Sequence, residues 1–490
     1  MLLKGSKKMY REDLTLLTDF YEMTMMQGYH KTSQEKKTAV FDVFYRENPS
    51  KSGYAIMAGL QQVIEYIENL HFSESDIEYI KGLNAFDDDF INYLKNFKFT
   101  GEIYAIPEGT VIFPMEPLIR IKAPIMQAQF VETAILNIIN HQSLIATKAS
   151  RVAWAAQGDP ILEFGLRRAQ GPDAGTLGAR AAVIGGCAGT SNVLAGKLFD
   201  IPVKGTHAHS WVMSFPTEIE AFRAYANKFP NDCTLLVDTY NTLTQGVPDA
   251  IKCFQEMRQE GIKLKNYGIR LDSGDLAYLS KKARIMLDKA GFEDALICAS
   301  SDLDENLIAS LKLQGAKIDT WGVGTRLITS NDCPSFGGVY KLSAETDENG
   351  NFVPKIKLSN NPSKVTLPGI KKVIRIYDKE SGKIKADLIT LDDEKYSEDK
   401  TLTLFDHNAT WKTMTLKPGT YALRELLVPV FINGKRVYSS PSTLDIREYA
   451  SKELNTLWEE HRRLENPHEV PVDLSETLFL LREKMIRELK

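Results

Sequence analysis

The sequence predicts an α/β fold: an irregular (β/α) barrel, with an N-terminal α+β domain and a smaller C-terminal unit. Short apolar runs alternate with amphipathic helical segments through the middle of the chain, and such alternation produces parallel strands joined by right-handed crossovers. Polar and charged residues directly follow these runs, and barrel active sites are built from strand ends. We expect domains at residues 1–125, 126–345 and 346–490.

The first 125 residues mix strand and helix patterns in no repeating order, as an α+β unit does. Segments 38–46 and 102–114 are apolar-rich and predict strands around proline and glycine turns. A helix is predicted from Met126, because one helical stripe gathers apolar side chains. The stripe consists of Val131, Ala134, Ile135, Ile138 and Ile139. We expect this helix to lead into the barrel.

Five apolar runs predict barrel strands. They are residues 161–164, 235–237, 268–271, 296–298 and 318–323. Two or three further strands are expected near Ile184, Val203 and Val339. A closed or irregular barrel fits this number of units better than an open doubly wound sheet, which is the alternative. The alternation stops after Lys341, and helices near 444–464 and 474–489 predict the C-terminal unit.

Composition limits the classes of protein that this chain can represent. Its 490 residues are 43% hydrophobic and 25% charged, which suits a folded chain of two or three packed units. A net charge of -4 disfavours a general nucleic-acid binder. No segment has the apolar length of a signal peptide or membrane span, and the five cysteines include no CxxC pair. We expect a cytoplasmic protein that binds neither membrane nor nucleic acid.

Residues suited to phosphate groups follow the first and last runs. Arg167 and Arg168 lie on a glycine-rich turn, where adjacent guanidinium groups can bind a diphosphate through charge-assisted hydrogen bonds. The alternative is a solvated pair of surface charges. Gly322, Gly324 and Thr325 follow the last run, and glycines there suit a phosphate cradle of backbone N–H groups.

Carboxylates follow the second and third runs. Asp238 suits a ribose hydroxyl or a Mg²⁺ shell, although it could simply begin a turn. Arg270, Asp272, Ser273 and Asp275 come after the third run. Asp275 matches a helix N-cap, whereas Asp272 is not needed to cap the helix. The two carboxylates together suit the vicinal hydroxyls of ribose and a bound Mg²⁺. After the fourth run, a capping box is predicted from Ser300, Ser301, Asp302 and Glu305.

Two histidines lie close together in the segment near Val203. In extended backbone, His207 and His209 point to the same side, which is also the HxH pattern of metal hydrolases. A catalytic zinc site needs further ligands, and the barrel segment supplies few. A structural histidine is the alternative for His207. For His209 a nucleophilic role is favoured, because the hydroxyls of Thr206 and Ser210 could hold phosphoryl oxygens.

Eight segments spread over nearly the whole chain form one ordered set. They are LLTDFYEMTMMQGY (16–29), FDVFYRENP (41–49), EFGLRRAQGPDAG (163–175), GTHAHSWVMSF (205–215), LLVDTYNT (235–242), GIRLDSGDL (268–276), DTWGVGTRLIT (319–329) and PSFGGVYKL (334–342). Together they resemble the nicotinate phosphoribosyltransferases, a family of type II phosphoribosyltransferases. Eight motifs in order are far more specific than any one of them.

The resemblance implies a reaction as well as a fold. It implies that nicotinate, phosphoribosyl pyrophosphate, ATP and water give nicotinate mononucleotide, diphosphate, ADP and phosphate, with Mg²⁺ as cofactor. This is a step of NAD salvage, a ligase reaction overall and a glycosyltransferase by chemistry. The resemblance also implies a homodimer with sites near the subunit interface.

The resemblance further implies roles for single residues. His209 is implied to be phosphorylated by ATP, and Tyr21 to stack on the nicotinate ring from the partner subunit. Asn241 stands where many members have an acidic residue, so a metal role there is in doubt. The remaining implied roles are Arg167 and Arg168 for the diphosphate, Asp272 and Asp275 for ribose and Mg²⁺, Gly324 and Thr325 for the 5-phosphate, and Arg270 near the nicotinate carboxylate.

Other functions stay open at this point. A nicotinamide or quinolinate phosphoribosyltransferase shares the barrel and diphosphate site but differs in the ring that it accepts. A metal-dependent amidohydrolase could use His207 and His209. A non-catalytic barrel could bind a nucleotide or a protein, because a fold does not fix a function.

Overall fold

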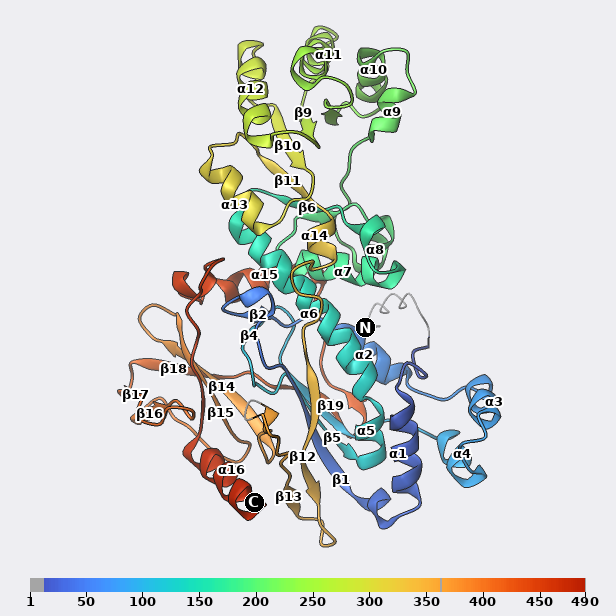
Figure 1. The fold of residues 1–490 in the computed structure, drawn as a ribbon, viewed down its shortest axis with the longest axis vertical. Coiled ribbons are helices and arrows are strands. Elements are labelled where there is room, and N and C mark those ends of the chain that lie inside the picture. The colour runs from blue at the N-terminus through green and yellow to red at the C-terminus, as the bar shows by residue number, and fades with distance from the viewer. Residues whose placement is uncertain (1–12, 362–363, 490) are drawn as a thin grey trace, which may run out of the picture. The chain divides into compact units, whose positions relative to one another are not determined.

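The computed structural model describes residues 13–361 and 364–489. The chain divides into two compact units, and Figure 1 labels many of their elements. Unit 1 comprises the chain up to Thr147 and from Ser335 onward, and unit 2 is Lys148–Pro334. The predicted range 126–345 therefore extends beyond unit 2 at both ends, and the predicted N- and C-terminal ranges lie in one unit.

Unit 2, which the structure describes throughout, contains a six-stranded parallel sheet in the order β7-β6-β11-β10-β9-β8. The strands are β6 (Ile161–Glu163), β7 (Gly189–Thr190), β8 (Asp232–Leu236), β9 (Asn266–Leu271), β10 (Leu296–Ser300) and β11 (Thr320–Val323). Chain order follows sheet order, and the last strand β11 pairs with the first, β6. A single parallel bridge, Thr190↔Val203, extends β7 toward β8. The sheet is thus an irregular barrel left open beside β8, which confirms the predicted fold class.

The helices of unit 2 follow the strands as predicted. They are the C-terminal part of α6 (Glu132–Ala155), α7 (Pro172–Ile184), α8 (Val193–Phe199), α9 (His209–Met213), α10 (Glu218–Lys228), α11 (Val247–Gln259), α12 (Leu276–Lys289), α13 (Glu305–Leu313) and α14 (Thr325–Ile328), with short turns η3 (Leu166–Arg168) and η4 (Thr242–Gly246). On α11, Val247, Phe254 and Met257 are buried, as on one face of an amphipathic helix. Helices α11, α12 and α13 thus separate strands β8 to β11, as the alternating pattern predicted.

Three expected strands are wrong or incomplete. Ile184 ends helix α7, because a short apolar run cannot be told from a buried helix by periodicity alone. Val203 forms only the isolated bridge to Thr190. Val339 begins a strand that belongs to unit 1 and pairs antiparallel with β1. The second barrel strand is instead the two-residue β7, which is too short for a recognisable pattern.

The predicted capping box after the fourth run is also wrong. Strand β10 continues to Ser300, and the N-cap of α13 is Asp304, whose side chain accepts the backbone N–H of Leu307 at 2.8 Å. An Asp side chain at the N-cap satisfies one of the free amides of the first helical turn. Ser300 therefore does not cap the helix and is the last residue of strand β10.

In the described part of unit 1, seven strands form an antiparallel sheet in the order β13-β12-β1-β5-β3-β19-β20. They are β1 (Thr38–Phe44), β3 (Glu102–Ala105), β5 (Ile119–Pro124), β12 (Val339–Thr346), β13 (Phe352–Pro354), β19 (Val428–Ile432) and β20 (Lys435–Arg436). A short pair, β2 (Ala55–Ile56) and β4 (Val111–Ile112), lies apart from this sheet. Strands from both ends of the chain thus share one sheet.

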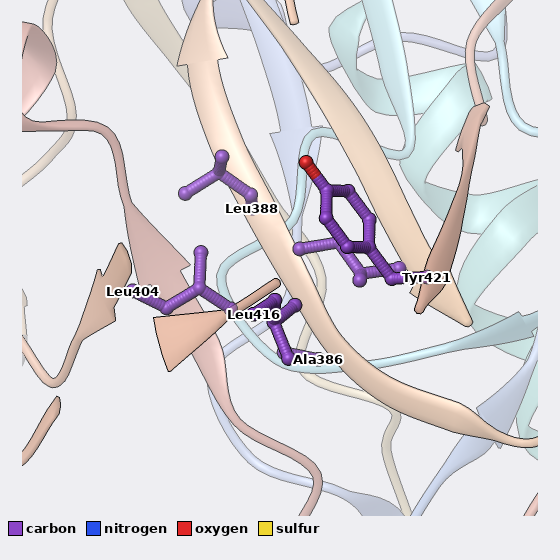
Figure 2. Packing of buried hydrophobic residues seen from close by; sticks show 6 residues of the cluster. Ala386, Leu388, Leu404, Leu416 and Tyr421 are labelled. Carbon is purple, nitrogen blue, oxygen red and sulfur yellow. The ribbon is translucent and has the colours of Figure 1, made fainter. Parts of the chain in front are cut away.

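The C-terminal part of unit 1 adds a second sheet, β18-β14-β15-β21, and a hairpin, β16-β17. These strands are β14 (Lys371–Asp378), β15 (Ile384–Leu391), β16 (Leu402–Phe405), β17 (Thr413–Leu416), β18 (Tyr421–Glu425) and β21 (Val472–Leu474). Figure 2 shows their apolar side chains packed together. Ala386 and Leu388 lie two residues apart on β15, so both point to the face that Leu404 and Leu416 of the hairpin cover.

Helices complete unit 1. They are α1 (Phe20–His30), α2 (Leu60–Asn69), α3 (Glu74–Gly82), α4 (Asp88–Leu94), α5 (Ile125–Phe130), the N-terminal part of α6, α15 (Thr443–Leu454) and α16 (Glu476–Glu488), with η1 (Ser33–Lys36), η2 (Pro49–Lys51) and η6 (Glu459–Arg462). The single helix expected from Met126 is two, since α5 ends before Val131 and α6 begins at Glu132. Within the described ranges, every helix is too short or too polar to cross a membrane.

Candidate active site

The carboxyl ends of β8, β9 and β10 bring the predicted carboxylates together. The backbone N–H of Asp272 donates to Asp238 Oδ2 at 2.9 Å, and Ser273 Oγ donates to the same oxygen at 2.6 Å. Ser300 Oγ donates to Asp272 Oδ1. Neighbouring parallel strands end at the same edge of the sheet, which is why residues so far apart in sequence meet. Asp238, Asp272 and Ser273 therefore form one cluster, as the sequence predicted.

Arg270 extends this cluster toward the segment that carries the histidines. Its side chain is only 14% exposed, and its Nη1 donates to Thr206 Oγ1. Nη2 lies 3.7 Å from Asp272 Oδ1. The buried Nε has no hydrogen-bond acceptor among the described residues. Because an unpaired buried donor is costly, this guanidinium favours a ligand that brings an anionic oxygen.

His209 is the first residue of α9 and faces the same cluster. Its Nδ1 lies 3.1 Å from Thr239 Oγ1, and its Nε2 lies 3.8 Å from Asp272 Oδ2. The side chain is 39% exposed. One ring nitrogen is thus held by a hydroxyl, while the other faces the open side of the cluster.

The residues on both sides of His209 are anchored. His207 is buried, and its Nε2 accepts the backbone N–H of Leu236 at 3.2 Å. Trp211 Nε1 donates to the carbonyl of Ala221 on α10 at 3.0 Å. Burial lowers the pKa of His207 to about 4, so its ring is neutral at pH 7. His207 is a structural histidine, and the segment that holds His209 is fixed at both ends.

The two imidazoles have different partners: His207 Nε2 accepts the backbone N–H of Leu236, whereas His209 Nδ1 lies 3.1 Å from Thr239 Oγ1. Because Nε2 of His207 is engaged with an amide, it is not available as a metal ligand. No group of three or more His, Cys, Asp or Glu side chains in the described ranges could hold a metal ion by itself. These observations do not favour the amidohydrolase alternative.

The turn that carries the two arginines is held by a buried carboxylate. Glu163, at the end of β6, accepts the backbone N–H of Gly165 and the hydroxyl of Thr190. Burial raises the pKa of this Glu163 carboxyl. Arg167 and Arg168 follow on η3, and both are exposed. Their guanidinium groups are therefore accessible to an external anion, and the turn that carries them is held by Glu163.

The glycine–threonine segment lies beside the arginine turn. Strands β6 and β11 are paired, and the backbone N–H of Phe164 donates to the carbonyl of Val323 at 2.8 Å. A Cβ at Gly322 would lie 2.7 Å from the Phe164 ring, so a larger residue would push the two strand ends apart. Gly324 is the N-cap of α14, and Thr325 is its first residue. The two predicted phosphate-binding segments are thus neighbours.

Asp275, Asn241 and Tyr21 also lie outside the hydrogen-bonded cluster. Asp275 is exposed and caps α12, accepting the backbone N–H of Tyr278 at 2.9 Å. Asn241 likewise caps η4 by accepting the N–H of Thr244 at 3.0 Å. Tyr21 lies on α1 in unit 1, where it is half exposed. The roles of Asp275 and Tyr21 in binding stay predictions.

Sequence reasoning missed three residues of the site. Thr239 and Ser300 each lie two residues beyond an apolar run, but hydroxyl side chains are common there and gave no separate signal. Glu163 lies within the first run and is the last residue of β6, where the sequence does not distinguish it from an ordinary polar residue at a strand terminus. Its importance comes from complete burial, which periodicity does not reveal.

Solved structures with the same fold define the class. The crystal structure of human nicotinic acid phosphoribosyltransferase matches with a TM-score of 0.83 and 29% identity, over 96% of this chain and 100% of that one. Nicotinate-nucleotide pyrophosphorylase from Pyrococcus furiosus shares the fold with a TM-score of 0.67 and 22% identity, over 92% and 98% of the two chains. The barrel is therefore that of a type II phosphoribosyltransferase.

Sequence comparison narrows the class to one family. The N-terminal domain of nicotinate phosphoribosyltransferase matches residues 16–140, the family itself 160–351 and its C-terminal domain 370–482. The nicotinate phosphoribosyltransferase of Bacillus subtilis is 47% identical over 98% of this chain and 96% of its own, and that of Mycobacterium tuberculosis is 42% identical over 94% and 92%. The chain belongs to the nicotinate phosphoribosyltransferase family, which confirms the resemblance in the sequence.

Proposed function

We propose that this chain transfers the ribose 5-phosphate unit of phosphoribosyl pyrophosphate to nicotinate and couples that step to ATP through a phosphorylated His209. The observation that carries the proposal is Arg270, which lies among Thr206, His209 and Asp272 with a buried donor left unpaired. An anionic ring acid such as nicotinate supplies the acceptor that this donor lacks.

Binding is distributed along the row of strand ends. Arg167 and Arg168 take the diphosphate, and Gly322, Gly324 and Thr325 take the 5-phosphate on the neighbouring strand end. Ser300 of β10 pairs with Gly322 of β11, so the proposed 5-phosphate site lies beside the strand end that contacts Asp272. The carboxylate cluster of Asp238, Asp272 and Ser273 binds the hydroxyls of the ribose.

The transfer step forms one bond and breaks another. The pyridine nitrogen of nicotinate attacks the anomeric carbon of the ribose, while the bond from that carbon to the diphosphate oxygen breaks. Arg270 orients the ring by its carboxylate, and the fixed turn under Arg167 and Arg168 holds the leaving diphosphate. Positive charge placed at the leaving group lowers the barrier, because negative charge develops there.

The donor set fits Mg²⁺ as the cofactor. Asp272 offers a hard carboxylate oxygen, Oδ2, which lies 3.8 Å from His209 Nε2, and Asp275 follows on the same turn. Mg²⁺ is commonly held by one or two carboxylates and completed by substrate phosphates. When bound, the ion neutralises charge on the diphosphate.

His209 is proposed to carry the phosphoryl group on Nε2, because Nδ1 is held by Thr239. Nε2 attacks the γ-phosphorus of ATP and ADP leaves with the electron pair of the broken P–O bond. Water later cleaves the N–P bond, giving phosphate and free imidazole. ATP changes the equilibrium only if the phosphorylated and free enzymes bind the ligands with different affinity. We also propose that the protein is a homodimer in the cytoplasm.

The test is diphosphate release from phosphoribosyl pyrophosphate and Mg²⁺ with nicotinate or nicotinamide, each with and without ATP. We expect release that depends on nicotinate and is stimulated by ATP. In His209→Ala that stimulation should disappear, whereas His71→Ala, an exposed histidine of unit 1, should keep it. Diphosphate release with nicotinamide but not with nicotinate would show that the chain uses a different ring substrate. No release with either ring would refute the proposal of a transferase.

A further inference from the structure

Helix α14, which carries the proposed phosphate-binding segment, is only one turn long. It spans Thr325–Ile328 and follows Gly324 directly. A helix this short forms few hydrogen bonds of its own, so its position depends on side-chain contacts with neighbouring elements. Some of these contacts are apolar: Leu327 and Ile328 are buried, and a Cβ at Gly165 would lie 2.5 Å from Ile328 Cβ. Helix α14 therefore packs closely against the start of the arginine turn.

An ion pair joins α14 to the start of α13. Arg326 Nη1 donates to Asp304 Oδ2, and the Asp304 side chain is 12% exposed. The other carboxylate oxygen, Oδ1, accepts the backbone N–H of Leu307 at 2.8 Å. Because both oxygens of Asp304 are bonded, its orientation is fixed, and it can serve as a fixed point for Arg326.

The start of α13 is itself anchored to α6. Glu305, the residue after Asp304, is buried. Its Oε1 accepts from Lys148 Nζ and from Arg151 Nε, each at 2.9 Å. Lys148 also donates to Oδ1 of Asp332, on the segment after α14, at 2.7 Å. Breaking a buried ion pair leaves an uncompensated charge, so this network resists displacement of the first turn of α13.

The connection from β10 to α13 carries backbone strain. Ser301 has a φ of 110° and Asp302 a φ of 38°, values that residues other than glycine rarely adopt. Such strain persists only where the surrounding residues hold the chain in place. At one end of the connection, Ser300 Oγ donates to Asp272 Oδ1; at the other end, Asp304 binds α14. The connection thus links the carboxylate cluster to the helix that follows the glycine segment.

We propose that Arg326 is a positioning residue for the 5-phosphate of the ribose substrate. Through Asp304 it fixes α14, and with it Gly324 and Thr325, at the separation from the carboxylate cluster that a pentose 5-phosphate requires. This inference rests on the proposed function for the roles of those two residues. A segment held in its binding conformation before the ligand arrives loses less entropy on binding.

The variants separate an action through Asp304 from direct contact with the ligand. Arg326→Met removes the donor. Asp304→Asn keeps a side-chain oxygen that can cap α13, but it removes the carboxylate that Arg326 binds. Arg326→Lys keeps the positive charge. The matched control is Arg223→Met, because Arg223 is 40% exposed, as Arg326 is, and its ion pair with Glu256 joins α10 to α11.

The measurement is calorimetric binding of ribose 5-phosphate and, separately, of diphosphate, both with Mg²⁺. We expect Arg326→Met and Asp304→Asn each to weaken ribose 5-phosphate binding by about fivefold, the most that a partly exposed ion pair usually contributes. Diphosphate affinity should stay at the wild-type value. The double variant should be no weaker than either single variant, since both remove the same pair. Arg326→Lys should lose less than Arg326→Met, and Arg223→Met should bind normally.

Three results would overturn the inference. If Arg326→Met weakens binding and Asp304→Asn does not, Arg326 contacts the phosphate itself. If the two losses multiply in the double variant, the residues act independently. An equal loss of diphosphate affinity would show general damage to the fold. Binding needs no turnover, so a wild type that meets these expectations but releases no diphosphate with nicotinate would refute the proposed function alone.

Discussion

His207 shows how one buried side chain makes stability depend on pH. Its pKa lies near 4 in the folded protein, mainly because of burial, with the charge of Arg270 adding to the effect, against an ordinary value of 6.5. Between these values the unfolded chain binds a proton that the folded chain does not. The free energy of unfolding therefore falls as pH falls from about 6.5 to about 4, by at most about 3 kcal/mol from this group.

Glutamine at this position should remove that dependence. We expect the stability difference between the wild type and His207→Gln to shrink as pH falls through this window, since only the wild type loses the contribution. Denaturant titrations at several pH values measure it, and hydrogen exchange of the Leu236 amide reports the same bond locally. The free energy of unfolding of His71→Gln, a change at an exposed site, should depend on pH in the same way as that of the wild type. Parallel curves for His207→Gln as well would contradict the prediction.

Single residues also show where sequence reasoning stops. The sequence predicted that Asp238, Arg270 and Asp272 meet, because parallel strand ends align whatever the details. It favoured a nucleophilic role for His209 but left the role of His207 open, because the sequence does not show that His207 is buried and bonded to the Leu236 amide.

At the level of elements, the end of β6 depends on the hydroxyl of Thr190 on β7. In Thr190→Val, Glu163 keeps only the N–H of Gly165 as a partner. We expect a loss of about 1–3 kcal/mol in the free energy of unfolding, because a buried carboxylate loses a donor. The KM for phosphoribosyl pyrophosphate should rise as well, since the arginine turn begins at Gly165.

The control for this variant is Thr234→Val, a half-buried threonine in β8. It makes the same chemical change in the same sheet, away from the arginine turn. Steady-state kinetics at varied phosphoribosyl pyrophosphate give the KM, and thermal unfolding gives the stability. Equal changes of KM in both variants would mean that Glu163 does not hold the turn in a functional position.

Element length explains which strands the sequence could predict. Strands β8 to β11 each carry four or more residues between amphipathic helices, so their apolar runs were distinct. Strand β7 has two residues, and its neighbour at Val203 makes only one bridge. The apolar run ending at Ile184 was therefore mistaken for the missing strand, although its residues form a buried helix.

At the scale of the whole molecule, the division into two units could not be predicted from local patterns. The chain leaves unit 1 after Thr147 and returns at Ser335, and β12 then pairs with β1, as in Ala39↔Glu345. Periodicity describes neighbours in sequence and gives no signal for pairing across 300 residues or more. The composition indicated two or three packed units but not which segments share one.

A buried ion network inside unit 1 tests whether the two units lose structure separately. Arg375 on β14 is fully buried, and it donates to Asp387 of β15 at 2.6 Å and to Glu453 of α15 at 3.3 Å. In Arg375→Met, Asp387 would stay buried without its cation, whereas Glu453 would keep its ion pair with Arg424, and the cost is about 3–5 kcal/mol. Lys372→Met is the control on the same strand, because its partner Glu425 is exposed and such a pair contributes at most about 1 kcal/mol.

Hydrogen exchange read by peptide reports each unit independently. We expect Arg375→Met to increase exchange in β14 and β15 strongly, while β9 and β10 of unit 2 keep most of their protection, because each unit has its own buried core. Lys372→Met should leave both regions close to the wild type. If β9 and β10 lose protection as much as β14 and β15 do, the chain unfolds as one cooperative body, and the two units are not independent in stability.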